Sequence, residues 1–225
     1  MKENNQNILI ISGGNLDIWF LETYLRYHEY NQIICVDGAL YVADQLNMTI
    51  DWLVGDFDTV SNELLLKYED MVEKNLISTK IRKYKPEKDA TDTQIAIELA
   101  MELGANEIVL LGATGTRLDH TLGNLNLLMK PLLNDIKACI INENNKIYLI
   151  NKTSVIKKQE QYGSYVSLIP LTEQVTEVTL TGFIYPLTNY MLTIGESIGI
   201  SNEIQEEEAS ITLEKGILIV VESKD

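Results

Sequence analysis

Apolar runs alternate with helical patterns along the chain as far as residue 142. Short continuous apolar runs predict buried strands over residues 8–12, 32–36, 51–55, 77–84, 107–111 and 136–142. Between them, apolar residues recur three and four positions apart, which predicts helices over residues 16–30, 39–47, 61–74, 92–103 and 119–130. Ser61 and Asp119 stand where two helices should begin, and Gly104 and Pro131 where two should end. Strands and helices in alternation indicate a mostly parallel sheet with helices on both faces.

The pattern changes near residue 147, where helical spacing disappears. Short apolar runs separated by Gly, Pro, Thr and Asn predict strands over residues 146–150, 165–169, 177–180, 197–200, 209–213 and 216–221. We therefore expect an α/β domain over residues 1–146, followed by an all-β sandwich domain over residues 147–225.

Composition narrows the class of protein. The chain has 225 residues, 45% of them hydrophobic, and a net charge of −15. This acidity argues against a nucleic-acid partner, which would require a basic surface. No run approaches the roughly 18 apolar residues of a membrane span, and the polar first residues are unlike a secretory signal, so we expect no membrane association. Cys35 and Cys139 lie in apolar runs, which indicates buried thiols and a cytoplasmic location.

Carboxylates follow the predicted strands at the point where each strand ends. Asp37, Asp56, Asp58 and Asp92 are such residues. Ligands of an open α/β sheet bind beyond the carboxyl ends of its strands, so these loops should converge on one rim. Asp56 and Asp58 lie on the same side if the backbone is extended, and a shared Mg²⁺ would relieve their repulsion. The pattern predicts a site for a magnesium-bound polyphosphate, with these four aspartates as metal ligands.

The loop over residues 112–117 (GATGTR) follows the fifth predicted strand and leads into a helix. Backbone N–H groups at a helix N-terminus can face a phosphate, and Arg117 offers a planar set of donors for its oxygens. The alternative is an ordinary strand-to-helix turn with a surface arginine. His120 could be a general base, a phosphate donor or a residue that supports Asp119; we favour a supporting or ligand-contact role.

These motifs resemble those of the thiamine pyrophosphokinase family. The resemblance lies in residues 37–39 (DGA), 55–59 (GDFDT), 88–92 (KDATD), 112–120 (GATGTRLDH) and 181–187 (TGFIYPL), together with Asn124 and residues 199–202 (GISN). It covers nearly the whole chain. Thr59 stands where the family usually has serine, and Thr116 where glycine is commoner.

The resemblance implies transfer of a pyrophosphoryl group from ATP to the hydroxyl of thiamine, giving thiamine diphosphate and AMP, with Mg²⁺ as cofactor. It also implies a homodimer that holds thiamine between the α/β domain of one subunit and the β domain of the other. The implied catalytic residues are Asp56, Asp58, Asp92 and Arg117. The implied nucleotide-binding residues are Lys88, Thr91, Gly112, Arg117, Asp119, His120 and Asn124. The implied thiamine-binding residues are Tyr185, Ser201 and Asn202.

Two other classes of function remain open from the residues alone. A magnesium-dependent phosphatase or glycosyltransferase could use the same Asp-x-Asp pattern, but neither accounts for the C-terminal segments. A non-enzymatic module could bind thiamine and ATP without forming AMP. The four acidic positions argue against such a module, because binding alone rarely needs so much paired negative charge.

Overall fold

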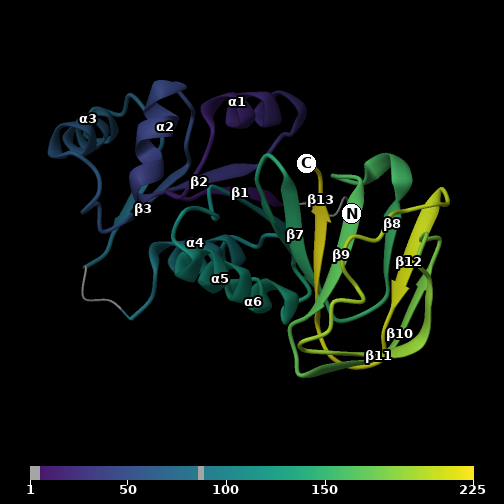
Figure 1. Ribbon diagram of the computed structural model, residues 1–225. Helices are drawn as coiled ribbons and strands as arrows, with labels where there is room; N and C mark the ends of the chain where they lie inside the picture. The colour runs from purple at the N-terminus through teal and green to yellow at the C-terminus, as the bar shows by residue number, and fades with distance from the viewer. Residues whose placement is uncertain (1–5, 86–88) are drawn as a thin grey trace, which may run out of the picture. The chain divides into compact units, whose positions relative to one another are not determined.

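The computed structural model describes residues 6–85 and 89–225 (Figure 1). The chain forms two compact units, Met1–Asn142 and Glu143–Asp225. The boundary that we expected from the sequence lies between residues 146 and 147. No helix in the described ranges is long and apolar enough to cross a bilayer.

The first unit contains a parallel sheet with the strand order β4-β3-β2-β1-β5-β6. Parallel pairing joins each neighbouring pair in that order. The strands are β1 (Asn7–Ile11), β2 (Gln32–Val36), β3 (Trp52–Gly55), β4 (Lys80–Lys83), β5 (Glu107–Leu111) and β6 (Lys137–Ile141). Central strands such as β1 and β5 are almost wholly apolar because both faces of the sheet are covered.

Helices cover both faces of this sheet, as the sequence predicted. The chain runs outward from β1 to β4, then crosses back to β5 and continues to β6, so right-handed crossovers place the two sets of helices on opposite faces (Figure 1). One set comprises α1 (Ile18–Tyr27), η1 (Asp37–Ala39), α2 (Leu40–Gln45) and α3 (Asn62–Glu73). The other comprises α4 (Asp92–Glu102), α5 (Leu118–Leu127) and α6 (Met129–Leu132).

Among the residues predicted at helix ends, Ser61 and Gly104 are confirmed, whereas Asp119 is not the cap that we predicted. Ser61 caps α3 by accepting a hydrogen bond from the Leu64 amide at 3.3 Å. Asp119, by contrast, lies in the first turn of α5, where Arg117 occupies the cap position without a side-chain capping bond. The helix predicted to end before Pro131 ends at Leu127, and Pro131 itself lies inside the separate short helix α6. A proline is tolerated there because the first-turn amides of a helix have no partner within it.

The second unit is a β-sandwich, which confirms the predicted fold class. One antiparallel sheet has the order β7-β13-β9 and the other β11-β10-β12-β8. The first contains β7 (Asn145–Ile150), β13 (Leu218–Ser223) and β9 (Tyr165–Pro170). The second contains β11 (Leu187–Thr193), β10 (Gln174–Thr181), β12 (Glu208–Thr212) and β8 (Ser154–Lys157), which is followed by η2 (Lys158–Glu160).

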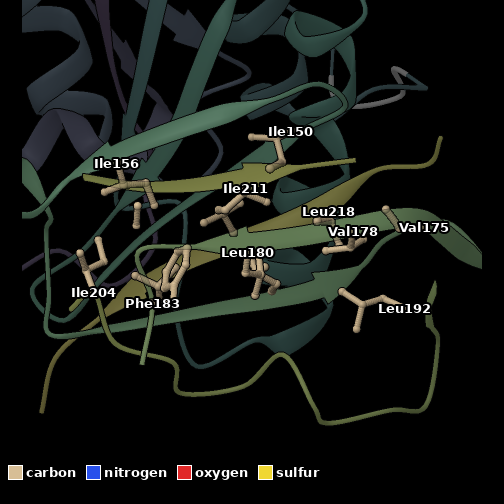
Figure 2. Close-up of a cluster of buried hydrophobic side chains, with 14 residues drawn as sticks. Ile150, Ile156, Val175, Val178, Leu180, Phe183, Leu192, Ile204, Ile211 and Leu218 are labelled. Atoms are coloured by element: carbon tan, nitrogen blue, oxygen red, sulfur yellow. The ribbon is translucent and has the colours of Figure 1, made fainter. Parts of the chain in front are cut away.

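Apolar side chains from both sheets form one core in this unit (Figure 2). Ile150, Leu218 and Val166 come from one sheet, and Leu180 and Ile211 from the other. Inward-facing and more exposed residues alternate along β10, except at an irregularity where Thr176 and Glu177 both separate the buried Val175 and Val178.

The strand predicted over residues 197–200 is wrong, and the strands β8 and β11 were not predicted. Residues 197–200 form turns, because the Ile200 amide bonds back to the Ser197 carbonyl at 3.1 Å. The apolar side chains of this turn are partly exposed, Ile198 by 51% and Ile200 by 46%. An apolar run alone could not separate this turn from a strand.

Candidate active site

A cleft of about 610 Å³ opens at the carboxyl ends of the parallel strands. The loops after β1, β2 and β5 line it, together with the first turns of α4 and α5. It lies where the chain direction reverses, because β1 leads away to β2 on one side while β5 leads away to β6 on the other. The connections that follow β1 and β5 therefore lead to opposite faces of the sheet, and open α/β sheets bind their ligands at this point.

Backbone hydrogen bonds lock the loops after β1 and β5 together. The Gly14 amide donates to the Gly112 carbonyl at 2.8 Å, and the Asn15 amide donates to the Thr114 carbonyl at 2.8 Å. A Cβ atom at Gly14 would lie 2.3 Å from the Gly112 carbonyl oxygen. Gly112 itself adopts a φ of 66°, which favours glycine. The predicted nucleotide-binding residue Gly112 thus shapes the cleft through its backbone.

Asp37, Asp56 and Asp58 form an acidic cluster at the rim. Each offers a carboxylate oxygen, and these oxygens lie within 4.8 Å of one another. The sequence analysis assumed an extended backbone from Asp56 to Asp58. The backbone is not extended there, because Phe57 adopts a φ of 62°. A turn brings the carboxylates together instead: the Asp58 amide donates to Asp56 Oδ1 at 3.2 Å, while Phe57 is buried.

The acidic cluster has the electrostatics of a cation site. The nearby charge of Asp56 raises the pKa of Asp58 above its ordinary value, with smaller contributions from partial desolvation and from Asp37. Asp37 Oδ2 accepts a hydrogen bond from Thr59, whereas its Oδ1 is buried and has no hydrogen-bond partner in the part of the chain that the structure describes. A hard divalent cation bound by carboxylate oxygens would satisfy that atom and offset the repulsion.

Asp92 lies outside this cluster but close to it. It begins α4, where Thr91 caps the helix by accepting a hydrogen bond from the Gln94 amide at 3.2 Å. Both residues line the cleft, and the charge of Asp92 contributes to the raised pKa of Asp58. Lys88, which we predicted as a nucleotide-binding residue, lies outside the described residues.

The loop after β5 presents Arg117 to the cleft, and the first turn of α5 presents His120. Arg117 is paired with Asp119, with 2.6 Å between the guanidinium and carboxylate, and this contact lowers the pKa of Asp119. Asn124 is buried and donates to the Ala113 carbonyl at 2.8 Å. Asp119 and Asn124 therefore order the loop, while Arg117 and His120 reach the space that a ligand would fill.

Sequence reasoning missed Ser12 and Thr93 as cleft residues. Their hydroxyl oxygens lie 2.8 Å apart, so they join the end of β1 to the first turn of α4. Both line the cleft. The available signal was that Ser12 is the first polar residue after the buried strand β1.

In the second unit, the predicted thiamine-binding residues lie close together. Tyr185 is 64% exposed, whereas Asn202 is buried. Asn202 Oδ1 accepts from the amides of Tyr185 at 3.0 Å and Glu203 at 2.9 Å, and Asn202 Nδ2 donates to the Tyr185 carbonyl at 2.8 Å. Ser201 is exposed, with a φ of 56°, and its amide donates to Ser167 Oγ at 3.0 Å. Asn202 therefore clamps the backbone that presents Tyr185.

We predict that Asp56→Asn raises the melting temperature of the metal-free protein at pH 7. The folded-state pKa of Asp58 is raised. The contribution of Asp58 to the free energy of unfolding is therefore greatest below its ordinary pKa of 3.8, and it falls as the pH rises through the folded-state value. Removing the Asp56 charge relieves this loss, and the difference should vanish at about pH 3. Thermal unfolding followed by circular dichroism measures both effects.

Asp119→Asn is the matched control, with the opposite sign. Arg117 lowers the pKa of Asp119, so the stability from this pair is present above the ordinary pKa and lost as the pH falls through the folded-state value. Asp119→Asn should therefore lower the melting temperature slightly at pH 7. A lower melting temperature for Asp56→Asn at pH 7 would show that the cluster is not repulsive.

Comparison with known proteins assigns both units to one family. The model of the thiamin pyrophosphokinase catalytic domain matches residues 25–140. The model of the thiamin pyrophosphokinase vitamin B1 binding domain matches residues 153–218. The thiamine pyrophosphokinase of Bacillus subtilis (strain 168) is 35% identical over 171 residues, which cover 76% of this chain and 77% of that relative.

Solved structures agree over almost the full length. The crystal structure of thiamine pyrophosphokinase from Bacillus subtilis superposes with a TM-score of 0.85 and 32% identity, covering 98% of this chain and 100% of the other. That of thiamin pyrophosphokinase from Geobacillus thermodenitrificans gives a TM-score of 0.82 and 31% identity, covering 98% of each chain. The chain belongs to the thiamine pyrophosphokinase family.

Proposed function

We propose that this chain transfers a pyrophosphoryl group from ATP to the hydroxyl of thiamine, giving thiamine diphosphate and AMP. The observation that carries the proposal is the acidic cluster beside a cleft at the switch point of the sheet. This arrangement suits a polyphosphate, because the cleft combines carboxylates for a cation with backbone amides and an arginine for phosphate oxygens.

Asp37, Asp56 and Asp58 would hold Mg²⁺, with Asp92 beside them. Two observations support this role: Asp37 Oδ1 is buried without a hydrogen bond from the residues that the structure describes, and the pKa of Asp58 is raised. When bound, the cation would neutralise negative charge on the polyphosphate. Magnesium usually keeps several waters and takes only one or two carboxylates directly, so the remaining aspartates would act through water.

The chain's own residues would position the phosphates and balance their charge. The loop before α5 lies at a helix N-terminus, where the helix dipole favours an anion. Arg117 would offset the charge that develops on the departing AMP, and its contact with Asp119 restrains the guanidinium. Gly112, Asn124 and Thr91 would shape the nucleotide site through the loop and cap contacts described above, while Lys88 and His120 would contact the nucleotide. Transfer of this kind depends mostly on positioning and charge stabilisation.

Thiamine would bind through the second unit. It is flat, aromatic and cationic, so the exposed ring of Tyr185 offers a surface for stacking. The exposed hydroxyl of Ser201 would hydrogen-bond the pyrimidine edge. Asn202 already makes three hydrogen bonds with the backbone, so only one N–H of its side chain is left for the ligand. We propose that its main role is to hold Tyr185 in place.

The direct test of this function mixes the purified protein with ATP, Mg²⁺ and thiamine and measures products by chromatography. AMP and thiamine diphosphate should appear in equal amounts. Asp58→Asn should abolish turnover while the circular dichroism spectrum stays unchanged, whereas Glu173→Gln, a control at an exposed carboxylate, should match the wild type. Inorganic phosphate in place of AMP would favour a phosphatase. Near-wild-type turnover by Asp58→Asn would refute the proposed metal role.

Tyr185→Ala should raise the KM for thiamine about tenfold, because stacking under a cationic ring contributes on the order of 1–2 kcal/mol. The KM for ATP should stay the same. Tyr185→Phe keeps the ring and should remain close to the wild type. Steady-state kinetics with each substrate varied in turn measure these values. An unchanged thiamine KM for Tyr185→Ala would exclude the stacking role.

We further propose that the chain acts in the cytoplasm as a homodimer, with the first unit of one subunit completing the thiamine site of the other. Three exposed apolar residues lie next to Tyr185 or just before Asn202 in the chain, namely Ile184, Ile198 and Ile200. Their exposure supports a surface near Tyr185 that the other subunit would cover. Multi-angle light scattering should give a mass of twice 25.5 kDa. A monomer at micromolar concentration would contradict this assembly. The buried thiols of Cys35 and Cys139 support a reducing compartment, which cell fractionation would check.

A further inference from the structure

The hydroxyl of Thr59 joins two loops that reach the acidic cluster from different strands. Asp37 follows β2, whereas Thr59 lies in the turn after β3. Thr59 Oγ1 donates a hydrogen bond to Asp37 Oδ2 across 22 residues of the chain. Asp37 Oδ1, in contrast, is buried and accepts no hydrogen bond from any described residue. One carboxylate oxygen is thus held by Thr59, and the other has no hydrogen bond from the described residues that would fix it.

Two glycines leave just enough room for this pair. A Cβ atom at Gly55 would lie 3.1 Å from the Cβ atom of Asp37, and one at Gly38 would lie 3.1 Å from Thr59 Oγ1. Both distances are shorter than ordinary van der Waals contacts, so a side chain at either position would push the pair apart. Asp37 also adopts a φ of 44°, an uncommon conformation for a residue other than glycine. The surrounding backbone therefore restrains where the carboxylate can lie.

The Thr59 hydroxyl completes that restraint by limiting rotation of the carboxylate. Without it, the Asp37 carboxylate would rotate more freely, and the repulsion from Asp56 and Asp58 would favour orientations that turn away from the cluster. A metal ligand that is oriented in advance by an outer hydrogen bond binds its ion more tightly, because less ordering is needed when the ion arrives.

We propose that Thr59 is a positioning residue: its hydroxyl holds Asp37 Oδ2 and so keeps the carboxylate oriented within the acidic cluster, ready to bind the divalent cation. This inference rests on the metal role proposed above for the acidic cluster. The hydroxyl is the operative group, so serine can replace threonine here, whereas valine, which has the same shape without the donor, cannot.

The test measures binding of Mn²⁺ alone to the metal-free protein, using electron paramagnetic resonance to follow free Mn²⁺. Thr59→Val should weaken Mn²⁺ binding about tenfold, which is typical for loss of a group that orients a metal ligand. Thr59→Ser should stay within about twofold of the wild type. Asp37→Asn serves as the reference for loss of the ligand itself. Thermal unfolding without metal checks that each variant is folded, and the Mg²⁺ concentration that gives half-maximal activity provides a second readout.

The variants separate the positioning role from the metal role. If Thr59→Val binds Mn²⁺ as the wild type does while Asp37→Asn binds it weakly, the positioning role is wrong and the metal role stands. Equal losses in Thr59→Val and Thr59→Ser also exclude it, because the hydroxyl is then not responsible. If Asp37→Asn binds Mn²⁺ normally, or if the wild type binds none, both this inference and the metal role of Asp37 are overturned.

Discussion

Parallel pairing of β1 with both β2 and β5 is the constraint on which the site depends. The chain leaves β1 toward β2 on one side and leaves β5 toward β6 on the other. The connections after β1 and β5 therefore lead to opposite faces of the sheet, and a cleft opens at this point. The same pairing brings those loops close enough to exchange backbone hydrogen bonds. Gly14 and Gly112 make that approach possible, since a Cβ atom at Gly14 would overlap the Gly112 carbonyl oxygen.

The acidic cluster stores unfavourable electrostatic energy that a cation would release. Asp56 and Asp37 raise the pKa of Asp58, and one oxygen of Asp37 is buried without a hydrogen bond from the described residues. An arrangement of this kind opposes folding of the metal-free chain. It becomes favourable once a ligand binds only the folded state, because such binding adds to the free energy of unfolding. Functional sites commonly keep groups that stability alone would not select.

In the second unit, a hydrophobic core instead of a charged cluster determines where the exposed residues lie. A sandwich core formed by two sheets supports the loops that carry the exposed residues Tyr185 and Ser201 (Figure 2). Asn202 illustrates this support: its buried side-chain amide replaces missing backbone pairing around Tyr185, and the ring of Tyr185 remains exposed. The side chain of Asn202, which the sequence predicted as a thiamine ligand, thus also holds the backbone of Tyr185.

The sequence by itself determined the class of fold and the set of polar segments at the strand ends. Hydrophobic periodicity reports burial, so it located β2 and β5 and the helix from Asp92, and it placed Asp37, Asp56 and Arg117 after strands. It misassigned residues 197–200, because an apolar run in a turn has the same pattern as a short strand. Only the tertiary structure decided how the carboxylates meet. Phe57 adopts a left-handed conformation, and Thr59 binds Asp37 across two loops. These contacts join residues far apart in the chain, and a local pattern carries no information about distances that are set by the packing of neighbouring strands.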